Sequence, residues 1–348
     1  MSPKFYFVTA DIPADILKLL KGKDRMSFFQ EAAYSKNAHL WGRQEWFWIV
    51  QTFLQTKRAG LDVELVDQPV ANSICITHFV ATKNKVWPSN CFIVGIRSDT
   101  SPLHTKDFEI VQSPALLSKK RSRFICLWPQ SDVSPRKTAR ENKIETISYF
   151  GGSGGLSPVF QNKQFRSSLQ ALGISLNLQF DTKQWGNYSQ TDLILAVRNH
   201  HHPLLINTKP ASKLINAWQA GCVALLGNEP AYRAVGTPGK DYFEVETPQD
   251  VLNIIYKLKD NPKLYQQVRK AGMSKYLEYD FDAIAQQWIA LLTGPITDAF
   301  IEWQNANQSS KLLRHPQRYY QSARQWLNHK LFYIPVRSQI LINNFIYR

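Results

Sequence analysis

Short apolar runs alternate with polar or amphipathic stretches along most of the chain. Apolar runs of four to six residues predict buried strands, and apolar positions recurring every three or four residues predict helices. The predicted strands are residues 4–9, 61–66, 73–78, 91–96, 108–112, 124–128, 144–150, 175–180, 191–197, 222–226 and 243–246. Helices are expected at 44–57, 159–172, 210–221, 248–259, 261–276 and 281–292. Strands that alternate with helices are typical of α/β proteins with parallel, doubly wound sheets.

The chain of 348 residues is long enough for two domains of ordinary size. The polar segment 129–143 contains two prolines and is predicted to be the linker between them. We therefore expect a first α/β domain over residues 1–138, a second over 139–308, and a basic, aromatic helical tail over 309–348. Both domains are expected to be Rossmann-like and doubly wound.

The net charge of +15 is unevenly distributed. Residues 309–348 carry seven Lys or Arg and no Asp or Glu, whereas residues 144–308 carry 14 of each sign. This distribution favours anionic partners. Nucleic acid is not expected, because the second domain is neutral and no recognition motif is present.

The four cysteines lie in or beside apolar runs without metal-binding spacing, and we expect them to be reduced core residues. No signal peptide and no segment long enough to span a bilayer is evident, so a cytoplasmic location is expected.

The segment from Lys209 to Arg233 is the most informative stretch of the sequence. Pro210 suits a helix start and Ser212 can cap it, which places Lys213 in the first turn. Free N–H groups and the positive end of the helix dipole favour a phosphate there. Asn216 follows one turn later on about the same side. The alternative is an ordinary amphipathic helix in which Lys213 is solvated.

The pattern Lys-x-x-Asn-Ala-Trp-x-x-Gly-x-x-Ala-Leu-Leu-Gly-x-Glu runs from Lys213 to Glu229. It resembles the nucleotide-sugar-binding helix of GT-B glycosyltransferases, both in retaining families with an E-x7-E motif and in some inverting fucosyltransferases. The resemblance implies a transferase that takes a nucleotide-diphosphate sugar as donor. A glycan or lipid-linked glycan is expected as acceptor, because the first domain and the tail are basic. The first domain would bind the acceptor. Many GT-B enzymes need no metal, so neither a metal nor another cofactor is expected.

The two glutamates of the E-x7-E motif fall on Thr208 and Asn216 in this chain. An amide can still hydrogen-bond a ribose, because it offers both donors and an acceptor. The departure leaves the retaining or inverting outcome open. It also keeps a second function open, a non-catalytic nucleotide- or glycan-binding protein on a degenerate GT-B fold.

Other candidate donor-binding residues lie in loops that follow predicted strands. Glycines let backbone N–H groups approach a phosphate, and arginine binds phosphate bidentately. With Lys213 and Asn216, the candidate set consists of Gly151, Gly152, Ser153, Gly154, Arg198, Lys209, Ser212, Glu229 and Tyr232. The three consecutive histidines at 200–202 are not expected to bind one metal ion, because adjacent residues in a strand-like geometry cannot all reach it.

Candidate catalytic residues lie at predicted strand ends in the first domain. His78 could act as a general base, and Arg97 with Asp99 could anchor the acceptor. The alternative is a hydrogen-bonded structural histidine beside a local Arg97–Asp99 ion pair.

The tail interleaves basic and aromatic residues. This composition suits an interfacial helix on an anionic membrane surface. The alternative is a helix that packs back on the first domain.

Overall fold

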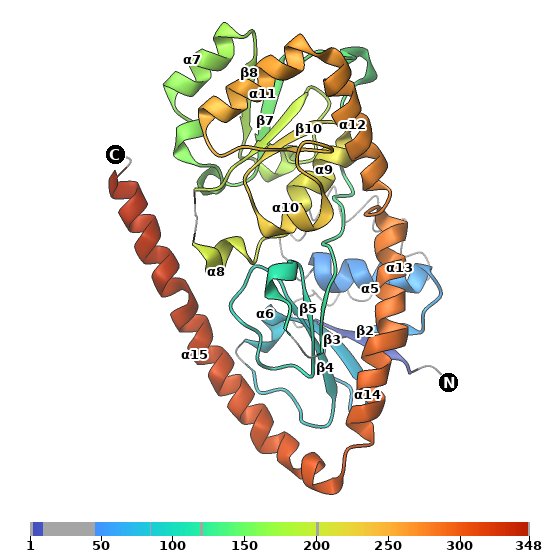
Figure 1. Cartoon of the computed structure of the whole chain (residues 1–348). Coiled ribbons are helices and arrows are strands. Elements are labelled where there is room, and N and C mark those ends of the chain that lie inside the picture. Colours follow the sequence, from blue (N-terminus) through green and yellow to red (C-terminus); the bar gives the residue numbers. More distant parts are fainter. Residues whose placement is uncertain (1–2, 10–45, 84, 119–120, 200–201, 347–348) are drawn as a thin grey trace. The chain divides into compact units, whose positions relative to one another are not determined.

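Figure 1 shows the computed structural model of the chain. The structure describes residues 3–9, 46–83, 85–118, 121–199 and 202–346. Residues 44 and 45 of a predicted helix, and His200 and His201 of the histidine triplet, lie outside these residues.

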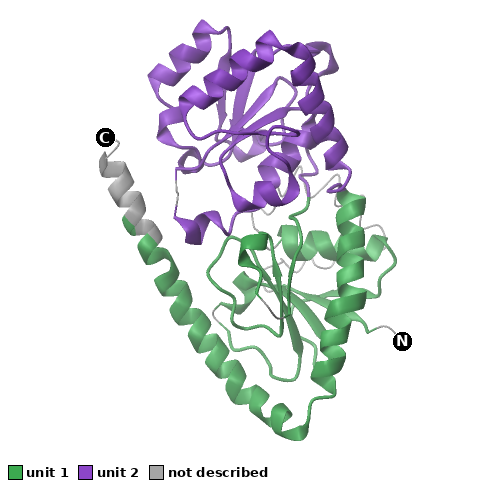
Figure 2. Cartoon of the chain, in the orientation of Figure 1, with its two compact units in different colours: residues 1–128, 281–348 green, residues 129–280 purple. Residues whose placement is uncertain are grey.

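The chain forms two compact units, which Figure 2 distinguishes by colour. Unit 1 consists of residues 1–128 and 281–348, and unit 2 consists of residues 129–280. The boundaries therefore differ from those expected at 138/139 and 308/309, because the chain returns to unit 1 after residue 280.

Unit 1 is built on a six-stranded parallel sheet in the order β2-β1-β3-β4-β5-β6. The strands are β1 Phe5–Val8, β2 Val63–Val66, β3 Ile74–His78, β4 Phe92–Arg97, β5 Phe108–Val111 and β6 Ser122–Phe124. The last strand was expected at 124–128 and lies earlier in the chain. The strand order reverses between β1 and β3, as in doubly wound sheets.

The helices of unit 1 come from both ends of the chain. They are π-helical turns at Trp46–Val50 and Leu292–Ile296, a 3₁₀ turn at Pro114–Leu116, and α5 Gln51–Arg58, α6 Phe79–Thr82, α13 Phe281–Leu291, α14 Thr297–Gln304 and α15 Gln308–Ile346. Helix α13 was expected in the second domain. It packs on unit 1 because Phe281 stacks on Trp128 and Trp288 meets Trp48 edge to face, with ring centroids 6.3 and 6.5 Å apart.

Unit 2 is built on a five-stranded parallel sheet in the order β11-β10-β9-β7-β8. The strands are β7 Thr146–Phe150, β8 Ser175–Gln179, β9 Leu193–Ala196, β10 Val223–Leu226 and β11 Phe243–Glu244. The order reverses between β7 and β9. The two sheets and the helical tail confirm the predicted fold class, an α/β protein with two Rossmann-like doubly wound domains.

The helices of unit 2 are α7 Lys163–Ala171, α8 Pro203–Ile206, α9 Ser212–Ala220, α10 Pro230–Val235, α11 Pro248–Asp260 and α12 Pro262–Tyr276. Short 3₁₀ turns lie at Thr138–Arg140, Ser153–Gly155, Pro158–Phe160 and Thr182–Gln184. Helices α7, α11 and α12 contribute to one apolar core with the sheet. Gly272 allows helices α9 and α12 to approach closely, since a Cβ at this position would collide with the Trp218 ring.

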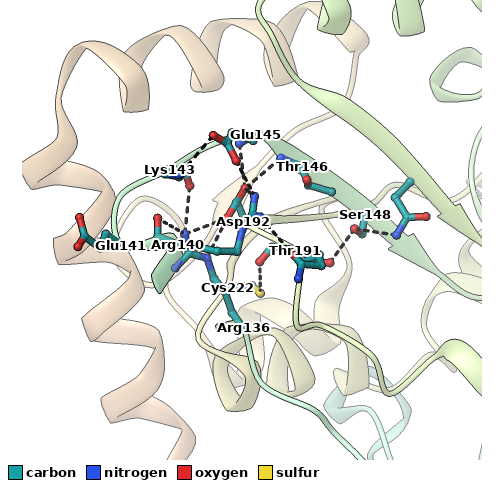
Figure 3. A network of polar contacts seen from close by, with 12 residues as sticks. Arg136, Arg140, Glu141, Lys143, Glu145, Thr146, Ser148, Thr191, Asp192 and Cys222 are labelled. Atoms are coloured by element: carbon teal, nitrogen blue, oxygen red, sulfur yellow. Dashed lines mark hydrogen bonds and ion pairs between the residues drawn. The ribbon is translucent and has the colours of Figure 1, made fainter. Parts of the chain in front are cut away.

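The segment 129–143 is not a free linker, because it packs on unit 2. Its main chain bonds that unit through Ser134 N to Gly186 O and Arg136 N to Ala220 O, at 2.8 and 2.9 Å. Figure 3 shows the charged network that holds it: Arg136 and Arg140 both bind the fully buried carboxylate of Asp192.

Asp192 lies at the amino end of the unit 2 sheet and forms hydrogen bonds with segment 129–143 and with the start of β7. Its Oδ2 accepts from Arg140 Nη2 at 2.6 Å and from the main-chain N–H groups of Glu145 and Thr146 at 2.8 and 3.0 Å. Burial alone would raise the pKa of Asp192, but these bonds and the charge of Arg136 hold it below its usual value.

Replacing Asp192 with Asn should strongly destabilise unit 2, since it leaves buried guanidinium charge uncompensated. We expect a loss of about 3–5 kcal/mol in the free energy of unfolding, measured by urea denaturation. Hydrogen exchange of β7 and β9 would assign the loss to unit 2. Glu145→Gln is the matched control, because Glu145 also pairs with Arg140 but is half exposed; it should cost less than about 1 kcal/mol. Equal effects of the two variants would contradict this prediction.

Candidate functional site

The carboxyl ends of β7 and β9 meet where the strand order of unit 2 reverses, the usual ligand position in doubly wound sheets. Strand β7 ends at Phe150 and leads into Gly151–Gly155, while β9 ends at Ala196, two residues before Arg198. The strand order therefore places the glycine-rich loop and Arg198 at the same carboxyl edge of the sheet.

Tyr149 hydrogen-bonds to the glycine-rich loop of residues 151–155. The Tyr149 hydroxyl donates to Gly152 O at 2.9 Å, and Gly155 N donates to the same oxygen at 2.9 Å. Gly152, Ser153 and Gly154 are exposed. A Cβ at Gly151 would lie 2.6 Å from Tyr149 Oη, so only glycine fits there.

Helix α9 brings Lys213 to this loop. The helix begins at Ser212, which makes no capping hydrogen bond in the structure, contrary to expectation; Ala211 precedes it. Lys213 is in the first turn as predicted. Its ammonium donates to Phe150 O and lies 5.0 Å from the centroid of the Tyr149 ring.

Lys213 is half-buried among charges that are mostly positive. Burial lowers the pKa of Lys213 to about 7; the positive charges of Arg198 and Lys209 act in the same direction, and Glu229 opposes them. Arg198, Lys209 and Glu229 therefore all act on the Lys213 ammonium.

Arg198 and Glu229 form an ion pair beside Lys213. Arg198 Nε lies 2.9 Å from Glu229 Oε1, and the Glu229 side chain is only 3% exposed. Burial would lower the pKa of Arg198, but Glu229 and Tyr232 raise it above its ordinary value. Burial raises the pKa of Tyr232, whose ring is fully buried. Glu229 Oε2 has no hydrogen-bond donor among the described residues.

A cavity of about 350 Å³ lies at the carboxyl ends of β9, β10 and β11. Its charged lining consists of Arg198, Arg233, Glu229, Glu244, Glu246 and Asp250, and its apolar lining includes Val197 and Ile206. Its rim includes Glu244, whose carboxylate accepts two bonds from Arg233 at 2.6 and 2.7 Å. A mixed polar and apolar lining suits a small polar ligand such as a nucleoside or sugar.

The structure does not bring every predicted donor residue together. Asn216 is buried and engaged by Gln130: its Oδ1 accepts from Gln130 N at 3.3 Å, and its Nδ2 donates to Gln130 Oε1 at 3.0 Å. Thr208 is fully buried. Thr208 and Asn216 stand at the two glutamate positions of the E-x7-E motif, and neither lines the cavity described above.

The predicted catalytic residues lie at the carboxyl edge of the unit 1 sheet. His78 is fully buried at the end of β3; its Nε2 lies 2.8 Å from Ser98 Oγ, and its Nδ1 accepts from Val80 N at 3.3 Å. Burial lowers the pKa of His78 to about 4, against the opposing charge of Asp99. The ring is therefore neutral at pH 7 and caps α6. Both ring nitrogens therefore have hydrogen-bond partners within unit 1.

Arg97 ends β4, beside β3, and its Nε donates to Thr100 O at 3.3 Å. Burial lowers the pKa of Arg97, while Glu109 raises it. The roles predicted for His78, Arg97 and Asp99 remain predictions.

Sequence reasoning did not identify Tyr149, the contact of Gln130 with Asn216, or the pairing of Arg233 with Glu244. Tyr149 directly precedes the end of a predicted strand next to a glycine run, a signal that could have identified it. Gln130 lies 86 residues from Asn216, so nothing in the sequence indicated their contact.

No metal site is evident in the ranges that the structure describes, where no three His, Cys, Asp or Glu side chains converge. His202, the described member of the histidine triplet, caps α8 by accepting from Leu204 N at 3.3 Å.

Comparison with known proteins finds similarity in structure only. No protein-family model matches the chain, and no curated protein matches it in sequence. The similar solved structures include sucrose-phosphate synthase from Thermosynechococcus elongatus, with 14% identity, a TM-score of 0.44, and coverage of 63% of this chain and 72% of that one.

Two further similar structures were determined with ligands. The pneumococcal O-GlcNAc transferase GtfA, in complex with UDP and GlcNAc, is 10% identical with a TM-score of 0.47, and the match covers 70% of this chain and 59% of GtfA. Anabaena HepE, in complex with UDP and glucose, is 11% identical with a TM-score of 0.46, and the match covers 84% of this chain and 100% of HepE. The fold assignment rests on the two sheets themselves.

Substituting Gly151 with Ala should weaken binding of an anion at this edge, because the new Cβ would lie 2.6 Å from Tyr149 Oη and 2.9 Å from Lys213 Nζ and would displace both side chains. We expect inorganic diphosphate, titrated by calorimetry, to bind about tenfold more weakly, the equivalent of about 1.4 kcal/mol. Gly152→Ala is the matched control, since a Cβ there meets nothing within 4 Å. Comparable losses in both variants would show that the collision is not the cause.

Proposed function

We propose that the chain is a glycosyltransferase that transfers a sugar from a nucleotide-diphosphate sugar to a glycan or lipid-linked glycan. The observation that carries this proposal is the group of basic side chains beside the glycine-rich loop at the switch point of unit 2. Lys213 lies there within reach of the charges of Arg198, Lys209 and Glu229. A bound diphosphate could pair with these basic groups.

The charged groups also fit the chemistry of sugar transfer. Negative charge develops on the diphosphate as the glycosidic bond breaks, and preorganised cations stabilise that charge in the transition state. Lys213 and Arg198 would serve this role together with the exposed backbone of the glycine loop. Because these cations can neutralise the leaving group, the proposal requires no metal or other cofactor.

The neighbouring cavity would receive another part of the donor. Glu229 pairs with Arg198 and is almost fully buried, and its Oε2 has no donor among the described residues, so it can accept a hydrogen bond from a sugar or ribose hydroxyl. Asn216 could bind the ribose only after its amide is released from Gln130. The acceptor would bind to unit 1, where the roles of His78, Arg97 and Asp99 rest on their positions at strand ends.

The first test is a thermal-shift screen of the purified protein against UDP, GDP, ADP and CMP and their common sugar conjugates. A ligand that binds only the folded state stabilises it by about 2.7 kcal/mol at 100 times its Kd. A shift with one nucleotide sugar, lost in Lys213→Ala, would support the donor site. Absence of any shift, with and without candidate acceptors, would count against the proposal.

Lys213→Ala should also lower kcat by about 100-fold, because Lys213 would bind charge that develops in the transition state. Donor turnover can be followed by release of the nucleotide diphosphate. Lys263→Ala, an exposed lysine of α12, is the matched control and should turn over normally. Unchanged turnover in Lys213→Ala would refute the assigned role.

Donor binding should depend on pH through Lys213. Only the protonated ammonium attracts the diphosphate, and the pKa near 7 in the free protein means that this form is lost as the pH rises above 7. We expect the association constant of a nucleotide sugar to fall about tenfold or more between pH 6 and pH 8.5. Lys213→Arg should remove this dependence, since a guanidinium does not titrate in that range. The same slope in both proteins would assign it to another group.

A non-catalytic protein that binds a nucleotide or glycan is the second candidate. Thr208 and Asn216, which stand at the glutamate positions of the E-x7-E motif, favour this candidate. Thr208 is buried, and Asn216 is hydrogen-bonded to Gln130. Binding of a nucleotide sugar without hydrolysis or transfer, across a panel of acceptors, would favour this candidate over the transferase.

A further inference from the structure

Helix α15 is attached to unit 1 by its polar side. Arg318 Nη2 lies 2.8 Å from Asp107 Oδ2, and the fully buried Gln325 accepts from the main-chain N–H groups of His104 and Thr105 at 2.8 and 2.9 Å. Gln325 also donates to Thr82 Oγ1 at 2.9 Å. The tail therefore does pack back on the first unit.

The outward side of α15 is apolar. Eight large side chains on it are each at least half exposed: Leu312, Leu313, Tyr319, Tyr320, Trp326, Leu327, Leu331 and Ile334. Most of them recur at intervals of seven residues, close to two helical turns, and therefore form one stripe along the helix. We call these eight side chains the outer stripe.

This arrangement is the reverse of an ordinary surface helix, whose apolar side faces the core. Contiguous exposed apolar surface of this kind marks an interaction site in a folded protein. Among the residues that the structure describes, no helix is long and apolar enough to cross a membrane. The outer stripe would accordingly lie against a partner or a surface.

The charge of the tail identifies the chemistry of that surface. Residues 309–348 contain seven basic residues and no acidic residue. Arg324 and Lys330 are exposed beside the stripe, and Lys330 Nζ lies 4.5 Å from the centroid of the Trp326 ring. Apolar and aromatic side chains flanked by basic ones match the boundary between lipid tails and anionic headgroups.

We propose that the outer stripe of α15 binds the surface of an anionic lipid bilayer while the polar side of the helix stays docked on unit 1. A second copy of the chain is a less suitable occupant. Pairing two α15 helices would bring basic side chains together with no acidic residue on either helix to offset them. The inference is independent of the proposed glycosyl transfer, since vesicle binding requires no donor.

The full-length protein should be tested by flotation with phosphatidylcholine vesicles that contain or lack phosphatidylglycerol. We expect it to float with the anionic vesicles only, and less as salt is added. No flotation with anionic vesicles at low salt, or equal flotation with both compositions, would overturn the proposal.

Substitutions on the outer stripe separate its contribution to vesicle binding from nonspecific adsorption through other exposed apolar residues. Leu327→Ser combined with Leu331→Ser should weaken vesicle binding at least tenfold, because two exposed leucines no longer enter the bilayer. Leu277→Ser, which changes a 66% exposed leucine of unit 2, is the matched control and should bind normally. All three proteins should unfold at the same temperature, since the substituted side chains are exposed.

Variants that remove a positive charge test the electrostatic contribution to vesicle binding. Arg324→Gln and Lys330→Gln should each weaken binding about fivefold, the equivalent of about 1 kcal/mol near an anionic surface. Full vesicle affinity in the double leucine variant would overturn the proposal. A concentration-dependent dimer without vesicle binding, lost in that variant, would also overturn it and assign the outer stripe to a second copy.

Discussion

The buried carboxylate of Asp192 is the constraint on which the arrangement of unit 2 depends. A lone carboxylate in that position would be very unfavourable, and two guanidiniums and two main-chain N–H groups make it tolerable. The same contacts fix the amino ends of β7 and β9 and tie segment 129–143 to them. Their carboxyl ends, roughly 17 Å away along β7, are thereby held in register, which keeps the glycine loop and Arg198 at one edge.

The two ends of this sheet handle charge in opposite ways. At the amino end, hydrogen bonds from Arg140 and the main chain favour the charged form of Asp192 and lower its pKa. At the carboxyl end, Lys213 has a main-chain carbonyl and an aromatic ring as neighbours, and its cationic surroundings work against its own charge. Such incomplete compensation costs stability, and it is what a site must retain if an incoming anion is to complete it.

The apolar periodicity was sufficient to predict the two sheets and most helices, because buried strands need continuous apolar runs wherever they occur. Contacts between distant residues were not visible in the same way. The network of Arg136, Arg140 and Asp192 joins residues more than 50 positions apart, so a polar, proline-containing segment resembled a linker. The position of Lys213 in the first turn of α9 was predictable from local helix chemistry. The hydrogen bonds between Asn216 and Gln130 and the burial of His78 depend on tertiary packing. The helicity of the tail was predictable, but not which of its sides faces unit 1, since the docked side is the polar one.

The docking of α15 has a geometric consequence for unit 1. A flexible basic tail would tether a domain to a surface and leave it free to tumble there. Helix α15 is instead fixed to unit 1 by buried polar contacts on one side, with its apolar side turned away. Any plane on which the outer stripe rests would therefore set the tilt of the unit 1 sheet relative to that plane. The edge of the sheet that carries His78 and Arg97 would then be presented at a constant height and angle above it.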